Sequence, residues 1–372
     1  MKQKNLKVKA NDRQAMLTIF FTAVLSRLLI LMVCAIALKA TNNTKPFSEI
    51  FGKAGDVPHY IYLAQNWYQS SGEQAKLIVF YPLLPMLMAV FRIVFRSYLV
   101  SAIVISYLSF GIAACYLYKL LKLSFDDEKT ADGLLAMLVG AFGIFFISGH
   151  TESLFLMLSA MGLYYAVRRN WIVCGVIGFL AGLEKTQGML LVVPAVYEAV
   201  MQVIETKKFD KKMLFVLLIP MGFVCYLILN KVVAGEFFKF MEYQKAAPWY
   251  NTPTWIAEGI STSYNTGMKH FSLSLIIYWP QIIMYFLSVA AIFVGAYKKV
   301  RTSYLLYIGA YIGMTYMHGW MISGGRYVTS CIGLYIVIAS IDNKYVKNTI
   351  ILLSGALFVL FSILWMKGYA IM

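Results

Sequence analysis

The chain has 372 residues, of which 60% are hydrophobic and only 13% are charged, and its formal net charge is +16. Soluble domains are about 45–50% apolar and about 25% charged, so this composition excludes an ordinary soluble protein and predicts that a bilayer surrounds most of the chain. The positive charge does not predict nucleic-acid binding, because the Lys and Arg residues form short clusters between apolar segments instead of one contiguous groove.

Apolar segments follow one another along almost the whole chain. A membrane-spanning helix needs about 20 apolar residues, and segments that approach this length lie near 15–39, 77–96, 97–121, 131–148, 152–167, 171–183, 188–204, 213–234, 273–296, 304–322, 327–341 and 347–366. We therefore expect an all-α polytopic membrane protein with about 10–12 transmembrane helices. Residues 1–372 are expected to form a single membrane-embedded domain with two long loops, 41–76 and 235–272. The first segment lacks a small-residue cleavage site and is expected to remain in the protein.

The basic clusters predict the topology. They lie at the N-terminus, 168–170, 205–212, 298–301 and 344–347, and the positive-inside rule places them on the cytoplasmic side. Residues 149–152, 184–187 and 323–326 then share the outer side with the two long loops. One segment between 77 and 148 cannot cross fully; the segment 77–96 is favoured because Pro82 and Pro85 interrupt its backbone, and 131–148 is the alternative.

Ionisable residues gather at the predicted outer ends of these segments. A charge in a bilayer is costly, so such residues are candidates for function. Carboxylates can accept a proton from an attacking hydroxyl, and Lys or Arg can bind a phosphate. The pattern therefore predicts group transfer from a phosphate-linked lipid. The candidates are Asp56 and His59 in "GDVPHY", His150 and Glu152 in "SGHTESLF", Glu184 and Lys185 in "LEKTQG", Arg326 in "SGGRY", and Arg27 inside the first segment.

Most of these residues also have a structural interpretation. Asp56 could cap a helix whose first turn contains Pro58, and Glu152 could compensate a helix dipole. Lys185 could extend toward the headgroups, and Arg27 could brace the first loop. Trp249, with its neighbours Tyr250 and Trp255, fits an interfacial belt as well as it fits sugar stacking.

A metal site is a further alternative for the acidic and imidazole side chains. Asp56, His59, His150 and Glu152 are chemically suitable ligands, but they lack a characteristic ligand spacing. No metal and no cofactor is predicted. The five cysteines all lie in apolar segments and are expected to be core residues.

Four sequence blocks resemble a known family. "GDVPHYIYLAQNWY" followed by "IVFYPLLP" is similar to the first-loop motif of the mannosyltransferases that add the second mannose of glycosylphosphatidylinositol anchors, and of their bacterial relatives. "SGHTESLF", "GLEKTQGMLLVVP" and "GGRYVTS" resemble three later blocks of this family in the same order. The chain departs from the family pattern at Gly55 (Trp), Trp67 (Gly), His150 (Tyr) and Lys185 (Arg). The Lys185 departure matters because Lys lacks the bidentate geometry of Arg.

The resemblance implies a GT-C-type helical bundle with short amphipathic helices in the first extracytoplasmic loop. It also implies a glycosyltransferase that moves a hexose, with mannose favoured, from a polyprenyl-phosphate donor to a hydroxyl acceptor with inversion. Asp56 is then the expected general base, and partial burial is expected to raise its pKa. Glu152 is expected to orient the acceptor or the base, and His59 to support Asp56 or to hold the phosphate.

The remaining expected site residues bind substrate. Lys185 and Arg326 are expected to hold the phosphate, and the set is completed by Arg27, Tyr60, Tyr81, His150 and Tyr327. The expected partners are the polyprenyl-phosphate-linked sugar and membrane lipid. The sequence leaves open the donor sugar, the acceptor and any protein partner.

The alternative function is a polytopic transporter or lipid flippase without transferase chemistry, because transporters also use broken helices and buried charges. The expected location is the cell membrane if the source is bacterial and the endoplasmic reticulum membrane if it is eukaryotic.

Overall fold

A computed structural model describes the chain except for residues 1–9, 43–44, 271–274, 322 and 372. Three parts of the sequence-based prediction lie outside the described residues. They are the basic residues Lys2, Lys4, Lys7 and Lys9 of the predicted cytoplasmic N-terminus, residues 43–44 of the first predicted loop, and residues 271–274 at the junction of the second predicted loop with segment 273–296. Elsewhere the described residues form helices joined by turns, and they contain no strand beyond one isolated bridge between Pro253 and His318.

Within the described residues, six helical segments are long and apolar enough to cross a membrane. They are Arg13–Ala40 in α1 (Ala10–Ala40), α5 (Tyr98–Leu121), Thr186–Thr206 across the 3₁₀ helix η3 (Thr186–Leu191) and α9 (Val192–Thr206), Lys211–Ala234 across η4 (Lys211–Leu217) and α10 (Leu218–Ala234), α14 (Tyr278–Tyr297) and α18 (Lys344–Met366). The chain is therefore an all-α, multi-pass membrane protein, and this part of the prediction is confirmed.

The number of full-length spans is smaller than the sequence suggested. The described residues contain six, or up to seven if one bent pair counts as a single span, whereas about 10–12 were expected. Several of the predicted segments form helices of 16 residues or fewer, which fall short of the roughly 20 residues needed. These are α4 (Leu83–Phe95), α6 (Asp127–Leu138), α7 (Glu152–Val167), α8 (Trp171–Glu184), α15 (Thr302–Tyr316), α16 (Gly324–Thr329) and α17 (Ile332–Ala339).

The bent pair lies in the segment that the topology marked as incomplete. The 3₁₀ helix η1 (Glu73–Val79) and α4 meet at an angle of 105°. Pro82 precedes the first residue of α4 and has no N–H to continue the helix across the break. The predicted interruption of 77–96 is therefore confirmed, as a broken span or a re-entrant loop. Segment 131–148 is also interrupted, because α6 ends at Leu138 and an irregular stretch leads to α7.

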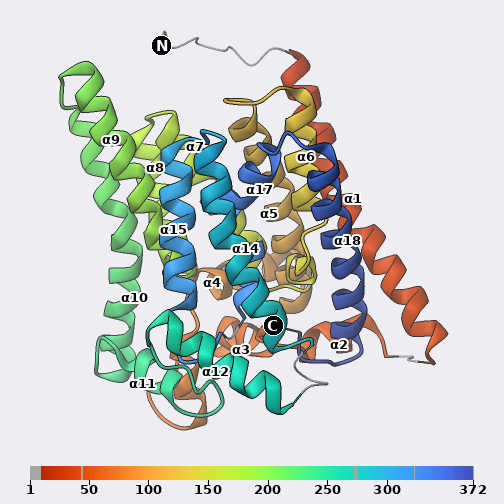
Figure 1. Cartoon of the computed structure of the whole chain (residues 1–372). Helices are drawn as coiled ribbons and strands as arrows, with labels where there is room; N and C mark the ends of the chain where they lie inside the picture. Colours follow the sequence, from red (N-terminus) through yellow and green to blue (C-terminus); the bar gives the residue numbers. More distant parts are fainter. Residues whose placement is uncertain (1–9, 43–44, 271–274, 322, 372) are drawn as a thin grey trace.

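The short helices of the two long loops gather at one end of the molecule. These helices are α2 (Phe47–Lys53), α3 (Val57–Asn66), α11 (Lys239–Lys245) and α12 (Ile256–Lys269). Figure 1 shows them at the bottom of the bundle, whereas α6 begins and α9 ends at the top. The first loop therefore carries short helices, as predicted.

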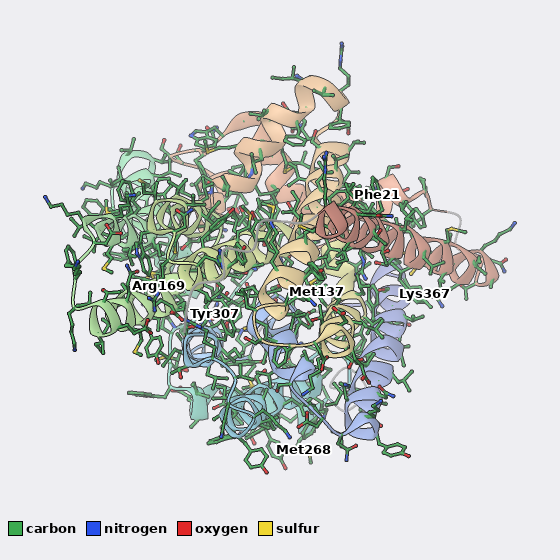
Figure 2. All side chains as sticks on the ribbon, turned by 90° about the horizontal axis from the view of Figure 1, so that it is seen from above. Phe21, Met137, Arg169, Met268, Tyr307 and Lys367 are labelled. Carbon is green, nitrogen blue, oxygen red and sulfur yellow. The ribbon has the colours of Figure 1, made fainter. Side chains whose placement is uncertain are left out.

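The bundle buries its interior and exposes apolar side chains on its periphery. Seen from above in Figure 2, Met137 and Tyr307 lie inside the bundle and are fully buried, while Phe21 and Met268 lie near its edge. Each of these two edge residues is 58% exposed. An apolar periphery of this kind suits a protein whose outer solvent is lipid.

Candidate functional site

Four charged side chains from distant parts of the chain form one cluster, in which Asp56 is half-buried and the other three are buried. Arg326 Nη1 donates to Asp56 Oδ2 at 2.7 Å, across 270 residues of sequence. The same guanidinium donates to both oxygens of Glu152, from Nε at 2.7 Å and from Nη2 at 3.1 Å. Lys185 Nζ donates to Glu152 Oε1 at 2.8 Å. We call Asp56, Glu152, Lys185 and Arg326 the charge cluster; the predicted convergence of these four residues is present in the structure.

Asp56 is positioned by the start of α3. It precedes Val57, the first residue of this helix, and Pro58 lies in the first turn, where a missing N–H costs nothing. The Asp56 side chain makes no capping hydrogen bond to α3. The capping interpretation is therefore wrong: the carboxylate turns away from the helix it precedes and bonds Arg326 instead.

Glu152 and Lys185 come from the ends of two short helices. Glu152 is the first residue of α7, and Lys185 follows α8 in an extended conformation that breaks the helix. The break is followed closely by Gly188, where a Cβ would overlap the carbonyl of Ala181. Glycine at this position lets η3 pack tightly against the end of α8, which holds Lys185 beside Glu152.

Arg326 lies in the short helix α16 and connects the cluster. Its guanidinium stacks over the ring of Phe145 at 4.7 Å, and the Gly325 N–H donates to Gln281 on α14. Lys185 lies over the ring of Tyr327 at 4.3 Å. Aromatic faces attract both cations, so they help to hold the two side chains where water is scarce.

Two cavities meet at the Asp56–Arg326 pair. The large cavity, of about 490 Å³, lies between α2, the start of α3 and the end of α18. The small cavity, of about 210 Å³, lies among the η1–α4 break, the ends of α7 and α8, and the loops after α11 and α15. Asp56, Ser323 and Arg326 line both cavities. A group held at this pair could therefore react with ligands that enter from two sides.

The pKa of Asp56 differs in direction from the expectation. Burial by itself raises the pKa of this carboxyl, but the nearby Arg326 guanidinium and His150 lower it, and the resulting pKa lies below the ordinary value. The expected rise is wrong because the sequence could not show that Arg326 bonds this carboxylate directly. Asp56 is ionised at neutral pH and is held in place by an arginine.

Three predicted tyrosines line the small cavity: Tyr60, Tyr81 and Tyr327. The Tyr81 hydroxyl lies 2.7 Å from that of Thr186, and its ring stacks on Tyr226 with centroids 3.9 Å apart. These tyrosines reach the cavity from α3, the η1–α4 break and α16. The structure therefore brings them together with the charge cluster.

The two predicted histidines lie beside the cluster and outside the described lining of both cavities. His59 stacks on Phe80 with centroids 5.1 Å apart, and its pKa is lowered by burial, although Asp56 opposes this shift. His150 is fully buried, and its Nδ1 lies 2.8 Å from the Ser148 hydroxyl. Both side chains are placed to support the wall of the site, while neither lines the space where a ligand would lie.

Two departures from the family pattern are neighbours in space. Gly55 has a φ of +55°, and a Cβ there would lie 2.7 Å from Nε2 of His150. A Trp side chain at position 55 would therefore collide with His150 unless the backbone moved. The glycine at position 55 therefore leaves the space that the His150 ring occupies, directly before Asp56.

Arg27 lies away from the site. It is fully buried between the rings of Phe110 and Phe358, at 4.4 and 4.8 Å from their centroids, and its Nη2 donates to the carbonyl of Leu138. Leu138 is the last residue of α6, which ends inside the bundle. A cation at a helix C-terminus satisfies a free carbonyl and stabilises the helix dipole. The expected role of Arg27 in the site is replaced by this structural one.

The proposed metal ligands do not form a metal site. Among the described residues, no group of three or more His, Cys, Asp or Glu side chains is arranged to hold a metal ion. Asp56 and Glu152 are joined through Arg326 instead, as described above. A cation therefore already lies between the two carboxylates.

Several lining residues were not predicted as site residues. The small cavity is also lined by Glu184, which the sequence analysis noted but left out of the site, and by Gln187, Gln244, Trp249, Asn251 and His318. The large cavity is lined by Lys45, Lys53 and Lys367. The aromatic residues near 249 were a usable signal, because sugar stacking was one of their two interpretations. The amides and lysines lie in polar loops, where their sequence context resembles that of any exposed residue.

Comparison with known proteins gives one informative similarity. No protein-family model matches the chain. A stretch of 99 residues is 33% identical to a curated membrane glycosyltransferase sequence, and it covers 26% of this chain and 28% of the relative. That relative is GPI mannosyltransferase 2 of Yarrowia lipolytica (strain CLIB 122 / E 150). The similarity is local and distant, and at most it supports a mannosyltransferase-like family.

Proposed function

We propose that this protein is an integral-membrane hexosyltransferase that uses a polyprenyl-phosphate-linked sugar and a hydroxyl acceptor. The observation that carries the proposal is the position of Asp56, a carboxylate paired with Arg326 at the junction of two cavities. Such a junction provides a base, a cation for a phosphate and separate access for two substrates. The partial similarity to a mannosyltransferase favours mannose as the transferred hexose.

The reaction breaks one bond and forms one. The acceptor oxygen attacks the anomeric carbon of the donor, and a new bond from carbon to the acceptor oxygen forms with inversion. The bond from the anomeric carbon to the phosphate oxygen breaks, and its electron pair leaves with the polyprenyl phosphate. Asp56 accepts the proton of the acceptor hydroxyl. No metal or redox partner is needed to balance this step.

The charges of the two cavities favour the large one for the phosphate. Its lining contains four cations, Lys45, Lys53, Arg326 and Lys367, and two acids, Glu49 and Asp56. The lining of the small cavity contains two cations, Lys185 and Arg326, and two acids, Asp56 and Glu184. A phosphate next to Arg326 in the large cavity would meet an excess of positive charge. The apolar side chains Ile50 and Trp365, which also line this cavity, suit the first part of a lipid chain.

Glu152 and Lys185 influence the base, Asp56, through its hydrogen-bond partner Arg326. Glu152 holds the Arg326 guanidinium by two hydrogen bonds, and Lys185 neutralises Glu152. When a phosphate competes for Arg326, the hold of Arg326 on Asp56 weakens, and the depressed pKa of Asp56 rises toward its ordinary value. Donor binding would in this way make Asp56 a better base at the moment when it is needed.

The sidedness of the reaction follows from the basic loops. The end at which α6 begins and α9 ends carries Lys129, Arg169, Lys207 and Lys298 in or near its turns. The positive-inside rule assigns this end to the cytoplasm. The charge cluster and both cavities lie toward the other end, so transfer would occur on the extracytoplasmic side.

A reconstituted assay tests the proposal. Purified protein in liposomes is given radiolabelled polyprenyl-phosphate mannose and a lipid extract from its own source as the acceptor, and product is separated by chromatography. We expect a new labelled glycolipid with the wild type, and a loss of product of at least about 100-fold with Asp56→Asn. Asp127→Asn is the matched control, because Asp127 is 92% exposed at the opposite end. Full activity in a correctly folded Asp56→Asn variant would remove Asp56 from the mechanism.

The broken helices keep one second candidate open for the same assay. The η1–α4 bend and the end of α8 line the small cavity, and transporters build their sites from such breaks. A transporter or flippase would move labelled donor across the liposome membrane without a new product. Redistribution without product would therefore favour the transporter, and product formation would favour the transferase.

A further inference from the structure

The small cavity contains polar atoms that have no partner. Neither carboxyl oxygen of Glu184 has a hydrogen-bond partner of normal geometry among the described residues, and its one nearby backbone donor, Leu84, makes at best a weak hydrogen bond. Asn251 Oδ1 and His318 Nδ1 are also buried without a partner in the described part of the chain. All three side chains line the small cavity.

Such atoms are rare in folded proteins because a buried polar atom without a hydrogen bond costs free energy. Glu184 is the most demanding case, since its side chain is only 1% exposed. It comes from α8, Asn251 from the loop after α11, and His318 from the loop after α15. Three separate segments thus contribute unpaired polar atoms to one space, as expected for a site whose hydrogen bonds are completed by a ligand.

The remaining properties of the cavity restrict the class of ligand. The two cations of its lining, Lys185 and Arg326, are already paired with the carboxylates of Glu152 and Asp56, which favours a neutral ligand over an anion. Its volume of about 210 Å³ lies below the roughly 300–1,000 Å³ of sites for drug-sized molecules, so it suits a single small ring. Trp249 in the wall, with Gln187 and Gln244 nearby, adds an aromatic face and further amide groups.

We propose that the small cavity binds one hexopyranose ring, that Glu184, Asn251 and His318 hydrogen-bond its hydroxyl groups, and that Trp249 contacts its apolar face. A sugar ring has hydroxyl groups that donate to the carboxyl of Glu184 and to Asn251 Oδ1, and apolar C–H faces that pack on an aromatic ring. Glu184 is thus a specificity-determining residue that touches substrate, distinct from the proton acceptor Asp56. The inference deepens the proposed transfer function, but sugar binding can be measured without any transfer.

Direct binding is the first test. The full chain is purified in a detergent without a sugar headgroup and titrated with methyl α- and β-mannopyranoside, methyl glucopyranoside and methyl galactopyranoside, with glycerol as a control. Binding is followed by tryptophan fluorescence and by saturation-transfer NMR of the glycoside. We expect saturable binding of at least one glycoside and none of glycerol. Failure of all glycosides to bind the folded wild type would overturn the proposal.

The variants decide whether the binding occurs in this cavity. Glu184→Gln is expected to weaken glycoside binding about 10–100-fold, because the new NH2 group cannot accept the hydroxyl hydrogen bonds that a carboxyl oxygen accepts. Glu198→Gln is the matched control, since Glu198 is a fully buried glutamate near the other end and should leave binding unchanged. Trp249→Phe should remove most of the fluorescence change while the NMR signal persists. Unchanged binding in Glu184→Gln would overturn the assignment; if that variant does not fold, Asn251→Ala provides the same comparison.

Kinetics then separate the two sources of the ring. If the bound ring is the sugar of the donor, Glu184→Gln raises the KM for polyprenyl-phosphate mannose in both transfer and acceptor-free hydrolysis. If the ring belongs to the acceptor, only the acceptor KM rises. In both cases kcat falls much less than in Asp56→Asn. Glycoside binding without any transferase activity would support this sugar site and refute the proposed transfer function. Transferase activity that Glu184→Gln leaves unchanged would support the transfer function and refute this sugar site.

Discussion

Two buried glutamates near opposite ends of the molecule each pair with an arginine, but the surroundings of the two pairs differ. Glu198 on α9 accepts two hydrogen bonds from Arg301, each 2.5 Å long, and Glu152 accepts two from Arg326. Both carboxylates are fully buried. The Arg326 side chain is only 8% exposed, contacts Asp56 as well and lines both cavities, whereas the Arg301 side chain is 40% exposed and lines neither.

The difference separates a candidate functional site from an ion pair that has no adjacent space for a ligand. A buried ion pair alone is weak evidence, because desolvation of the two charges offsets much of their attraction. The pair near the charge cluster differs in having an additional carboxylate and adjacent space for ligands. A matched set of substitutions at the two ends can therefore separate stability from function.

The largest effect is expected when either buried glutamate loses its charge. Glu152→Gln should lower the free energy of unfolding by about 3–5 kcal/mol, because it leaves the buried Arg326 without its full counter-charge. Glu198→Gln should lower it less, because water reaches the Arg301 side chain, which is 40% exposed. Denaturation in detergent measures this loss. Only Glu152→Gln should abolish sugar transfer in the protein that remains folded. Equal transfer activity in the two variants would contradict the comparison.

The second effect concerns the two arginines. Arg326→Lys should lower the transfer rate about 10²–10³-fold, because a lysine cannot reproduce the forked contacts with Asp56 and Glu152 and still bind a phosphate. Arg301→Lys should stay within a few-fold of the wild type. Initial rates at saturating donor measure both. A fully active Arg326→Lys variant would show that the forked geometry is not used.

A smaller effect is expected at the glycine next to Asp56. Gly55→Ala should destabilise the protein by about 1–2 kcal/mol from its positive φ, and further because the new Cβ meets His150. Gly235→Ala is the control: Gly235 is left-handed, with a φ of +81°, and has no atom near its Cβ position. The thermal unfolding temperature should therefore fall more for Gly55→Ala than for the control. Only Gly55→Ala should also lower the rate of sugar transfer. Replacement of His150 by Ala in the Gly55→Ala background should recover part of the loss.

The smallest effect is the acid dependence of stability. The folded-state pKa of Asp56 lies below its ordinary value of about 3.9, so its contribution is present at neutral pH and is lost as the pH falls through the folded-state pKa. The contribution of Asp342, at the other end, is also lost as the pH falls, since hydrogen bonds from Lys129 and Lys298 lower its pKa to about 2. Asp56→Asn and Asp342→Asn should each flatten the decrease in stability below about pH 4.

Added salt distinguishes the two acids. The Asp342 side chain is 60% exposed, so salt should screen its ion pairs. The Asp56–Arg326 pair is more buried and should keep its effect. The measurement is a set of unfolding curves at low and high ionic strength. Their pH runs from about 2 to about 6, which brackets the ordinary carboxyl pKa of about 4. A salt-sensitive Asp56 effect would mean that this pair is open to water.

Local sequence patterns predicted part of the fold and part of the candidate site. The apolar segments and basic clusters predicted a polytopic helical protein, and the alternation of sides predicted that Asp56, Glu152, Lys185 and Arg326 face one end. Helix lengths were predicted less well, because an apolar run does not reveal that Lys185 adopts an extended conformation or that α6 ends at Leu138 inside the bundle. The pKa of Asp56 was wrong in direction for a similar reason: it depends on a partner 270 residues away.

The amino-acid sequence by itself determined the solvent of this protein and the types of residue available for chemistry, because these depend on composition and on the order of charged and apolar segments. Only the tertiary structure decided which charged side chains meet. Arg27 bonds the last carbonyl of α6, while Arg326 bonds the carboxylates of the charge cluster. Glu184, Asn251 and His318 come to line one cavity. The physical reason is that hydrogen bonds and ion pairs act over a few ångströms, and those distances are set by how distant segments pack.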